Sequence, residues 1–331
     1  MTVLSWLWVP VCFAAAGALW TRYAEAREAK RSVPPGRFVT IAGRQLHVNQ
    51  RGSGGPAVVI ESGGAASSVK WWPILDRLAA HTTVLTYDRA GLGWSDPAPL
   101  PRSIEDRAEE LARVLEQSGV PAPYVLVGLS YGGPIIRVFA ARYSERVAGL
   151  VFVDSAHESV FHRPAAQAYL RRSARLLRVA GLLARLGALR AFRLRGIPTA
   201  PTALPFSDAE LRLLQGRFPP VHTFATGADE FRSMQDISQA MSGLDAPGAL
   251  RRKPIVVISH GLPFPGPFAV LEEGHLEGQQ ALAALSAQGT LVVARQSSHA
   301  VPLQEPEVVI EEILRVVHSA QEMILGATAS A

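Results

Sequence analysis

The segment Gly128-Leu129-Ser130-Tyr131-Gly132 constrains the fold of this chain more than any other. It follows the apolar run Tyr124–Val127 and precedes a second apolar stretch, Pro134–Ala140. This order is typical of a sharp turn between a strand and a helix that holds the serine hydroxyl above a sheet. Glycine on both sides removes side chains that would clash in so tight a turn. A plain Gly-Ser loop is the alternative, but the flanking strand and helix favour Ser130 as a nucleophile.

The remaining pattern predicts an α/β fold with a mostly parallel, eight-stranded sheet flanked by helices. An opening hairpin is expected at 38–41 and 45–49. Six short, nearly all-apolar runs have the composition of strands buried on both faces, at 57–60, 84–87, 124–127, 150–153, 255–259 and 290–294. Helices are expected at 103–118, with Ser103 as the N-cap, and at 306–320.

The alternation of strands and helices stops between Ser155 and Lys253, where the chain is rich in Arg and Leu and favours helix. We expect this insertion to form a lid over the strand ends, where ligands bind in such sheets. The predicted organisation is a core at 37–154 and 251–321 with a helical lid at 155–250.

The N-terminal stretch Thr2–Trp20 holds no charged residue over nineteen positions. That length just suffices to cross a bilayer, and a flank rich in Lys and Arg follows it. The pattern predicts a single-pass transmembrane anchor at 1–21 and a basic linker at 22–36, with the main domain in the cytoplasm. A cleaved signal peptide fits less well, because no Lys or Arg precedes the apolar run. A docking helix in a soluble protein is the third interpretation.

Positive charge is concentrated in one part of the chain. Between Phe161 and Arg195 there are nine arginines and no acidic residue. Around 169–189 the leucines fall at helical spacing, and the arginines fill the opposite positions. Such a helix could lie on anionic lipid and admit lipophilic esters, whereas an ordinary lid helix with solvated arginines is the alternative. No nucleic-acid partner is expected, because the run matches no known docking module.

Four motifs give the chain a resemblance to the α/β-hydrolase superfamily from Arg37 to about Ala320. Each follows a predicted strand: Glu61-Ser62-Gly63-Gly64, the segment Asp88–Asp96, the turn at Gly128–Gly132, and Ser297-Ser298-His299. The resemblance implies an α/β-hydrolase fold with a helical lid. It also implies that Ser130 is the nucleophile and His299 the base.

The residues support the same roles. A serine hydroxyl at its free pKa is a weak nucleophile and needs a base to accept its proton. His299 is the best candidate, because it follows the last predicted strand and has small neighbours that leave the ring room to reach Ser130. The other histidines, His260 and His275 among them, are expected to be surface or core residues.

The acid that orients the imidazole departs from the usual family pattern. Most relatives carry it after the seventh strand, but the loop Ser259–Gly266 holds no carboxylate. Asp154 ends the sixth strand, where some members of the superfamily place their acid. We expect Asp154 to fill this role, with Glu272 or Glu273 as alternatives. A histidine with a backbone partner or no acid at all is also open.

The fold implies an oxyanion hole made of two backbone N–H groups. The expected donors are Tyr131, which follows the nucleophile, and Gly64. In that loop Ser62 replaces the usual histidine of the family. Asp88 and Arg89 are interpreted as structural residues that brace loops near the site.

The function expected is hydrolysis of a carboxylic ester or related acyl bond in a small-molecule, lipophilic substrate. Serine at the turn argues against the dehalogenases and epoxide hydrolases of the superfamily, which use aspartate there. A catalytically silent binding protein, a lyase and a haloperoxidase-like enzyme remain as alternatives. The single cysteine, Cys12, excludes an intrachain disulfide. Neither a metal nor an organic cofactor is expected, because no ligand-spaced cluster is present and serine chemistry needs none.

Overall fold

A computed structural model describes residues 4–194, 206–242, 244, 248 and 250–329 of the chain. Its centre is an eight-stranded sheet with the order β1-β2-β4-β3-β5-β6-β7-β8. The strands are β1 (Arg37–Ile41), β2 (Arg44–Arg51), β3 (Ala57–Glu61), β4 (Val84–Tyr87), β5 (Tyr124–Leu129), β6 (Val147–Val153), β7 (Ile255–His260) and β8 (Gly289–Ala294). β2 pairs antiparallel with β1 and β4, and all other pairs are parallel. The predicted fold class is confirmed.

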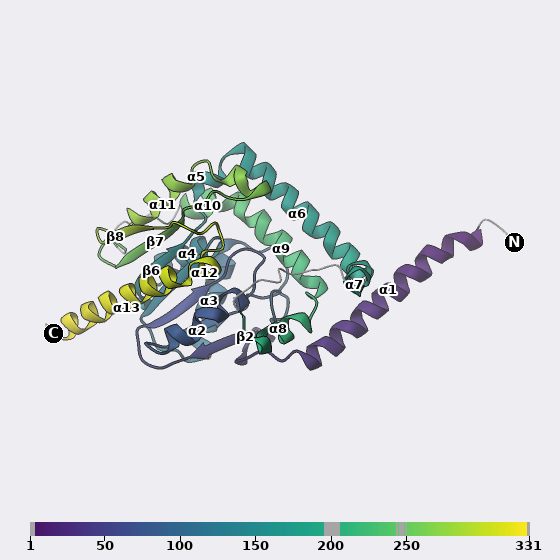
Figure 1. Cartoon of the computed structure of the whole chain (residues 1–331), viewed down its shortest axis with the longest axis horizontal. Coiled ribbons are helices and arrows are strands. Elements are labelled where there is room, and N and C mark those ends of the chain that lie inside the picture. Colours follow the sequence, from purple (N-terminus) through teal and green to yellow (C-terminus); the bar gives the residue numbers. More distant parts are fainter. Residues whose placement is uncertain (1–3, 195–205, 243, 245–247, 249, 330–331) are drawn as a thin grey trace.

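Helices cover both faces of the sheet, because the central strands are buried on both sides (Figure 1). One face packs against α2 (Trp72–Ala79) and α13 (Pro306–Ala329). The other packs against α3 (Ile104–Ser118), α4 (Gly132–Arg142) and α11 (His275–Ala283). A short helix, α12 (Val301–Gln304), lies just before α13.

The boundaries of α3 show how the sequence sets an element. The side chain of Ser103 accepts a hydrogen bond from the Asp106 N–H, and the Asp106 carboxylate accepts one from the Ser103 N–H. This capping box satisfies two of the free N–H groups at the helix start. The helix ends at Gly119, which adopts a left-handed conformation with φ 68°. The predicted N-cap is confirmed.

The predicted lid segment is helical and lies between β6 and β7. Its helices are α5 (Glu158–Phe161), α6 (Pro164–Arg185), α7 (Ala188–Leu194), α8 (Asp208–Gln215), α9 (Val221–Ser233) and α10 (Ile237–Ser242). The long helices α6 and α9 lie side by side above one end of the sheet (Figure 1). Short 3₁₀ turns occur at η1 (Ser68–Trp71), η2 (Ser144–Arg146), η3 (Met234–Asp236) and η4 (Gly266–Leu271).

The N-terminal segment differs from its prediction. A single helix, α1 (Leu4–Arg31), covers most of the predicted anchor and continues through the first ten residues of the predicted linker. The Glu-Ala-Arg-Glu-Ala-Lys-Arg sequence at 25–31 consists of strong helix formers, which explains this continuation. Among the described residues, no helix combines the length and apolar character needed to cross a bilayer, so the predicted transmembrane helix is not found there. The first three residues of the predicted anchor lie outside the described part of the chain.

Candidate active site

Ser130 lies in the turn between β5 and α4, with a left-handed backbone (φ 51°) that non-glycine residues rarely adopt. Gly128 and Gly132 lie so close to neighbouring backbone that a side chain at either position would clash. A Cβ atom on Gly132 would lie 2.4 Å from the Glu61 carbonyl oxygen, and one on Gly128 would lie 2.9 Å from the Gly132 backbone. The strained turn is therefore held by close packing of three backbone segments. It presents the Ser130 side chain at the carboxyl end of the sheet.

Asp154 follows the last residue of the neighbouring strand β6. Its backbone is also left-handed (φ 44°), and its N–H donates to the Ile258 carbonyl at 2.7 Å. The side chain is almost fully buried, with an exposed fraction of 2% for the residue. Asp154 Oδ2 lies 2.6 Å from His299 Nδ1. The structure thus brings the predicted acid and the predicted base together, although 145 positions separate them in the chain.

Two further histidines contact the same carboxylate. His260 Nδ1 lies 2.8 Å from Asp154 Oδ1, and His275 Nε2 lies 3.0 Å from that oxygen. The His260 N–H also donates to it, at 3.1 Å. Burial alone would raise the pKa of Asp154, but the hydrogen bonds from His260, His275 and His299 outweigh burial and hold the pKa well below its usual range. Asp154 is therefore a stable carboxylate inside the protein.

His260 and His275 are buried, which agrees with the expectation of surface or core residues, but their contacts with Asp154 were not predicted. His260 is the last residue of β7, directly beside the end of β6, and its ring stacks on that of His275 with centroids 4.2 Å apart. Burial lowers the pKa of His260, but Asp154 and Glu272 outweigh it and raise that pKa. The signal in the sequence was a histidine at the strand end where most relatives have their acid.

The alternative acids lie elsewhere. Glu272 accepts a hydrogen bond from the Phe264 N–H at 3.0 Å, and its other oxygen lies 3.4 Å from His260 Nε2. Glu273 forms an exposed ion pair with Arg163. Neither carboxylate contacts His299 in the described structure. Glu272 therefore lies at the edge of the cluster formed by Asp154, His260 and His275, and Glu273 lies outside it.

Ser130, Asp154 and His299 line one cavity of about 340 Å³ beneath the lid. Its wall is mainly apolar and includes Phe161, Leu170, Phe231, Met234, Phe264 and Phe268. The Ser130 hydroxyl and the His299 ring share this space without a hydrogen bond between them in the described structure. Such bonds are often long before a substrate binds. An apolar group bound in this cavity would lie against the serine.

Of the two predicted oxyanion donors, Gly64 lines the same cavity and Tyr131 is buried directly behind it. Gly64 lies against Tyr131, since a Cβ atom on Gly64 would be 3.5 Å from the Tyr131 Cβ. Gly64 lies in the loop after β3, and Tyr131 caps the start of α4. Neither N–H has a backbone partner within the described part of the chain. Two free N–H groups beside a serine are the arrangement that stabilises an oxyanion.

Arg89 fixes the loop that carries Gly64. Its guanidinium donates to the carbonyl oxygens of Ser62 and Gly63, both at 2.7 Å, and to Glu61 and Glu230 at 2.5 and 2.7 Å. A further bond to Glu230 completes five, which is the full donor capacity of arginine. The bracing role expected for Arg89 therefore agrees with its contacts.

Glu230 connects this network to the lid, because it lies on α9. One of its oxygens accepts from the Ala65 N–H at 2.6 Å. Burial alone would raise the pKa of Glu230, but Arg89 and Arg107 outweigh it and lower that pKa. Arg107 in turn contacts Asp229 at 2.9 Å. The lid and the predicted oxyanion loop thus share one buried set of charges that sequence reasoning missed.

Asp154, His260 and His275 place potential ligand atoms within 4.8 Å of one another. Both rings lie at hydrogen-bond distance from one carboxylate oxygen, with Asp154 also bound to His299. We assign these contacts as hydrogen bonds that orient the carboxylate.

Comparison with known proteins adds the following. The family model described as "alpha/beta hydrolase fold" matches residues 56–311. A Gibberella zeae protein named "AB hydrolase superfamily protein" is 38% identical over 123 residues, which make up 36% of this chain and 38% of that protein. The chain thus spans less than half the length of this relative.

Two solved structures show the same fold at low identity. A thermophilic esterase from Thermogutta terrifontis matches with a TM-score of 0.60 and 21% identity, covering 86% of this chain and 98% of that one. The enol-lactonase from Burkholderia xenovorans LB400 matches with a TM-score of 0.59 and 21% identity, covering 84% and 98%.

Proposed function

The chain belongs to the α/β-hydrolase fold family, and we propose that it is a serine hydrolase that cleaves a carboxylic ester or related acyl bond through an acyl-enzyme on Ser130. One observation carries the proposal. Ser130, in a strained turn, lines the same apolar cavity as the hydrogen-bonded pair of His299 and Asp154. An esterase and a lactonase among proteins of the same fold are consistent with it.

The residues of the site have distinct roles in the proposed reaction, and His299 acts in turn as base and as acid. His299 accepts the Ser130 proton as the serine oxygen attacks the carbonyl carbon. The N–H groups of Gly64 and Tyr131 stabilise the resulting oxyanion, and collapse of this intermediate expels the alcohol with the proton from His299. Water, activated by His299, then releases the acid. Asp154 holds the ring orientation and stabilises the imidazolium in both steps.

The cavity lining sets the substrate class. Aromatic and aliphatic side chains from the lid and from η4 surround the serine, with Tyr169 and Phe268 packed at 5.5 Å between ring centroids. Burial of an acyl chain there contributes about 25 cal/mol per Å² of apolar surface. We therefore propose an uncharged, lipophilic acyl ester as the substrate.

Hydrolysis of p-nitrophenyl esters of increasing chain length tests this function. Wild type should hydrolyse at least the shorter esters, and Ser130→Ala should lose at least about 10⁴-fold in kcat. Ser155→Ala and Ser298→Ala are matched controls, because both serines line the same cavity and have no assigned role. Absence of turnover by the wild type on every acyl ester would favour a silent binding protein instead.

A further inference from the structure

The C-terminal half of α1 is fastened to the lid. Thr21 Oγ1 donates to the Ala184 carbonyl at 3.2 Å, and this threonine is buried. Two turns further along α1, Glu28 forms an ion pair with Arg190 at 2.6 Å. α1 and α6 therefore present neighbouring outer faces on one side of the molecule (Figure 1).

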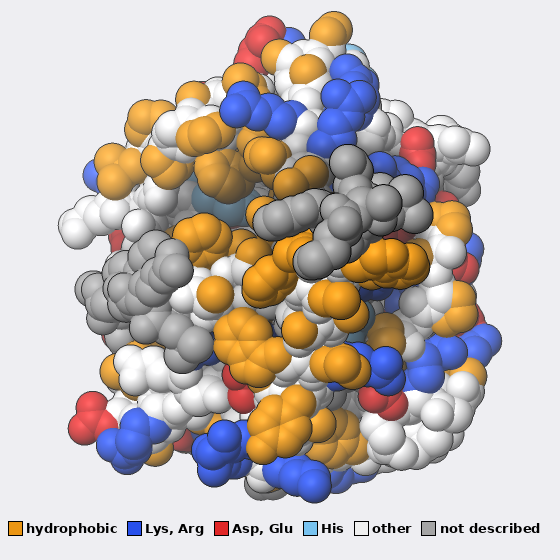
Figure 2. Space-filling model, turned by 90° about the vertical axis from the view of Figure 1, so that its right-hand side faces the viewer, with side chains coloured by type: hydrophobic (Ala, Val, Ile, Leu, Met, Phe, Trp, Pro, Cys, Tyr) orange, Lys and Arg blue, Asp and Glu red, His pale blue; other side chains and the backbone are white. Residues whose placement is uncertain are grey.

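These outer faces expose large apolar side chains. On α1, Trp8 and Phe13 are 65% and 75% exposed, and Leu19 and Tyr23 are also exposed. Val179 and Leu183 are exposed on α6. Figure 2 shows hydrophobic side chains gathered across this side of the molecule, with Lys and Arg around them. An apolar surface of this kind on a folded protein marks an interaction site.

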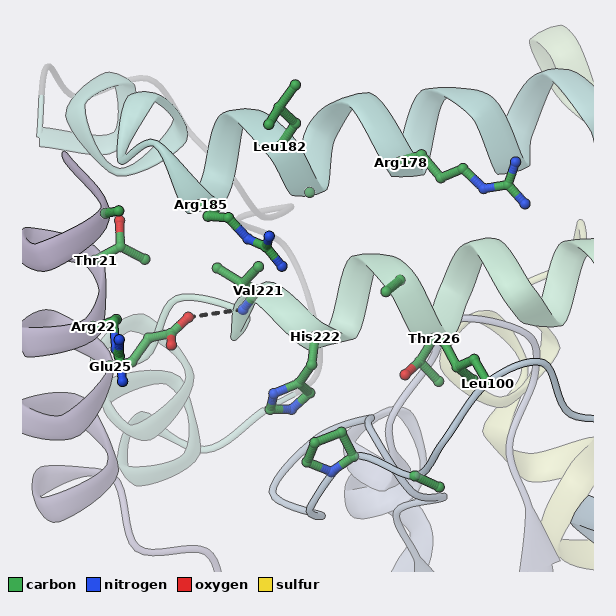
Figure 3. A pocket seen from close by; sticks show the side chains of 15 residues that line it. Thr21, Arg22, Glu25, Leu100, Arg178, Leu182, Arg185, Val221, His222 and Thr226 are labelled. Carbon is green, nitrogen blue, oxygen red and sulfur yellow. Dashed lines mark hydrogen bonds between the residues drawn. The ribbon is translucent and has the colours of Figure 1, made fainter. Parts of the chain in front are cut away.

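A cleft of about 840 Å³ opens between α1, α6, α9 and the loop around Leu100. Arg178 and Arg185 reach it from one face of α6, two turns apart, and Arg22 lies on α1 across the cleft (Figure 3). Leu182, between the two α6 arginines, contributes apolar surface to the wall. The cleft thus combines three guanidinium groups with an aliphatic lining.

The guanidinium groups of Arg22, Arg178 and Arg185 form no ion pair with any residue that the structure describes. The segment 195–205, outside the described part, contains no Asp or Glu, and Asp245 also lies outside that part. The acidic residue that lines the cleft, Glu25, accepts a hydrogen bond from the Val221 N–H at 2.8 Å (Figure 3). The guanidinium groups are therefore available to an external anion.

We propose that this face docks the protein on the surface of an anionic phospholipid bilayer, with a lipid phosphate held in the cleft by Arg22, Arg178 and Arg185. Guanidinium groups match phosphate geometry. The apolar sides of α1 and α6 enter the boundary between headgroups and acyl chains, as amphipathic helices do. A nucleic acid would leave most of the exposed apolar side chains unburied, so lipid fits both features. The docking does not depend on the chemistry at Ser130.

Sedimentation with vesicles tests the proposal on the full chain. The vesicles consist of phosphatidylcholine alone or of phosphatidylcholine mixed with phosphatidylglycerol. The cleft variant carries Arg22→Gln, Arg178→Gln and Arg185→Gln. The control carries Arg142→Gln, Arg251→Gln and Arg252→Gln, which remove the same charge from exposed sites at the opposite ends of the strands from the lid.

The wild type and the control should bind the anionic vesicles much more tightly than the neutral ones. Each basic residue near an anionic surface contributes about fivefold in partitioning, so the cleft variant should bind about 100-fold more weakly. Equal loss in both triple variants, or unchanged binding of the cleft variant, would overturn the proposal. The proposal would also be overturned if the wild type did not bind anionic vesicles and instead formed dimers that the cleft substitutions abolish. Circular dichroism shows whether the variants are folded.

The single cysteine provides an independent readout. Cys12 is exposed on α1 and can carry a polarity-sensitive fluorophore without other substitutions. Anionic vesicles should shift its emission to the blue, and the cleft substitutions should abolish the shift at the same lipid concentration. Emission that does not change while the protein sediments with the vesicles would show that a different face binds, and would also overturn the proposal.

Discussion

The buried carboxylate of Asp154 contacts three imidazole rings. His299 lies at hydrogen-bond distance from Oδ2, and His260 and His275 lie at hydrogen-bond distance from Oδ1. Two of these rings lie outside the proposed reaction path. They saturate the carboxylate with hydrogen bonds, which keeps its pKa low and fixes its orientation toward His299.

Asp154→Asn should lower kcat for ester hydrolysis by about 10⁴-fold with little change in KM, because an amide disfavours the productive tautomer of His299. Glu273→Gln is the matched control. Its ion pair with Arg163 is exposed, so its removal should leave kcat and stability nearly unchanged. If Glu272→Gln abolished activity while Asp154→Asn retained it, the assignment of the acid would be wrong.

The contribution of His260 to the free energy of unfolding should depend on pH. Because its pKa in the folded protein is raised above 6.5, its contribution is fully present below pH 6.5 and is lost as the pH rises through the raised pKa. The difference in free energy of unfolding between wild type and His260→Gln should therefore be larger at acidic pH than at alkaline pH. Urea titrations across this pH range measure it. A difference that grows with pH would contradict the assigned direction.

At the scale of elements, buried charges join the lid to the sheet. Arg89 follows β4, Glu61 ends β3 and Glu230 lies on α9, and all three are at most 2% exposed. A shift of α9 would therefore disturb the loop that carries Gly64. The packing of Tyr131 belongs to the same region, because its hydroxyl is 2.6 Å from Ser233 Oγ on α9.

Arg89→Met should lower the free energy of unfolding by about 3–5 kcal/mol, since it removes the guanidinium that pairs with two buried carboxylates, those of Glu61 and Glu230. Arg113→Met provides the control, because its pair with Glu109 is a partly exposed i,i+4 pair on α3, worth about 0.3–0.5 kcal/mol. Urea unfolding measures both. Similar small losses in the two variants would mean that the network does not hold the lid to the core.

The sequence predicted the elements well where one local signal decides them. Continuous apolar runs placed the strands β3 to β8 to within a few residues, and Ser103 marked the start of α3. It did not predict the contact between His260 and Asp154, because these residues lie 106 positions apart and only the parallel pairing of β6 and β7 brings them together. The pairing of Arg89 with Glu230 was not predicted for the same reason, because 141 positions separate them in the chain.

At the scale of the whole molecule, the N-terminal helix and the lid form one surface. The composition of the apolar run at the N-terminus predicts an anchor, but composition carries no information about the contacts of the helix. Its contacts depend on α6 and α7, more than 160 positions later, through Thr21 and Glu28. The proposed docking face and the proposed catalytic cavity lie on the same lid. The helix α6 contributes to both, because Tyr169 and Leu170 line the cavity and Arg178 and Arg185 line the cleft.

Location of the covalent adduct after reaction with a fluorophosphonate tests the central claim most directly. Peptide mapping by mass spectrometry should find the adduct on Ser130, and Ser130→Ala should carry none. Because Ser155 and Ser298 line the same cavity, the map distinguishes the proposed nucleophile from its neighbours. An adduct on either of those serines, or a wild type that forms no adduct, would contradict the assignment of Ser130 as the nucleophile.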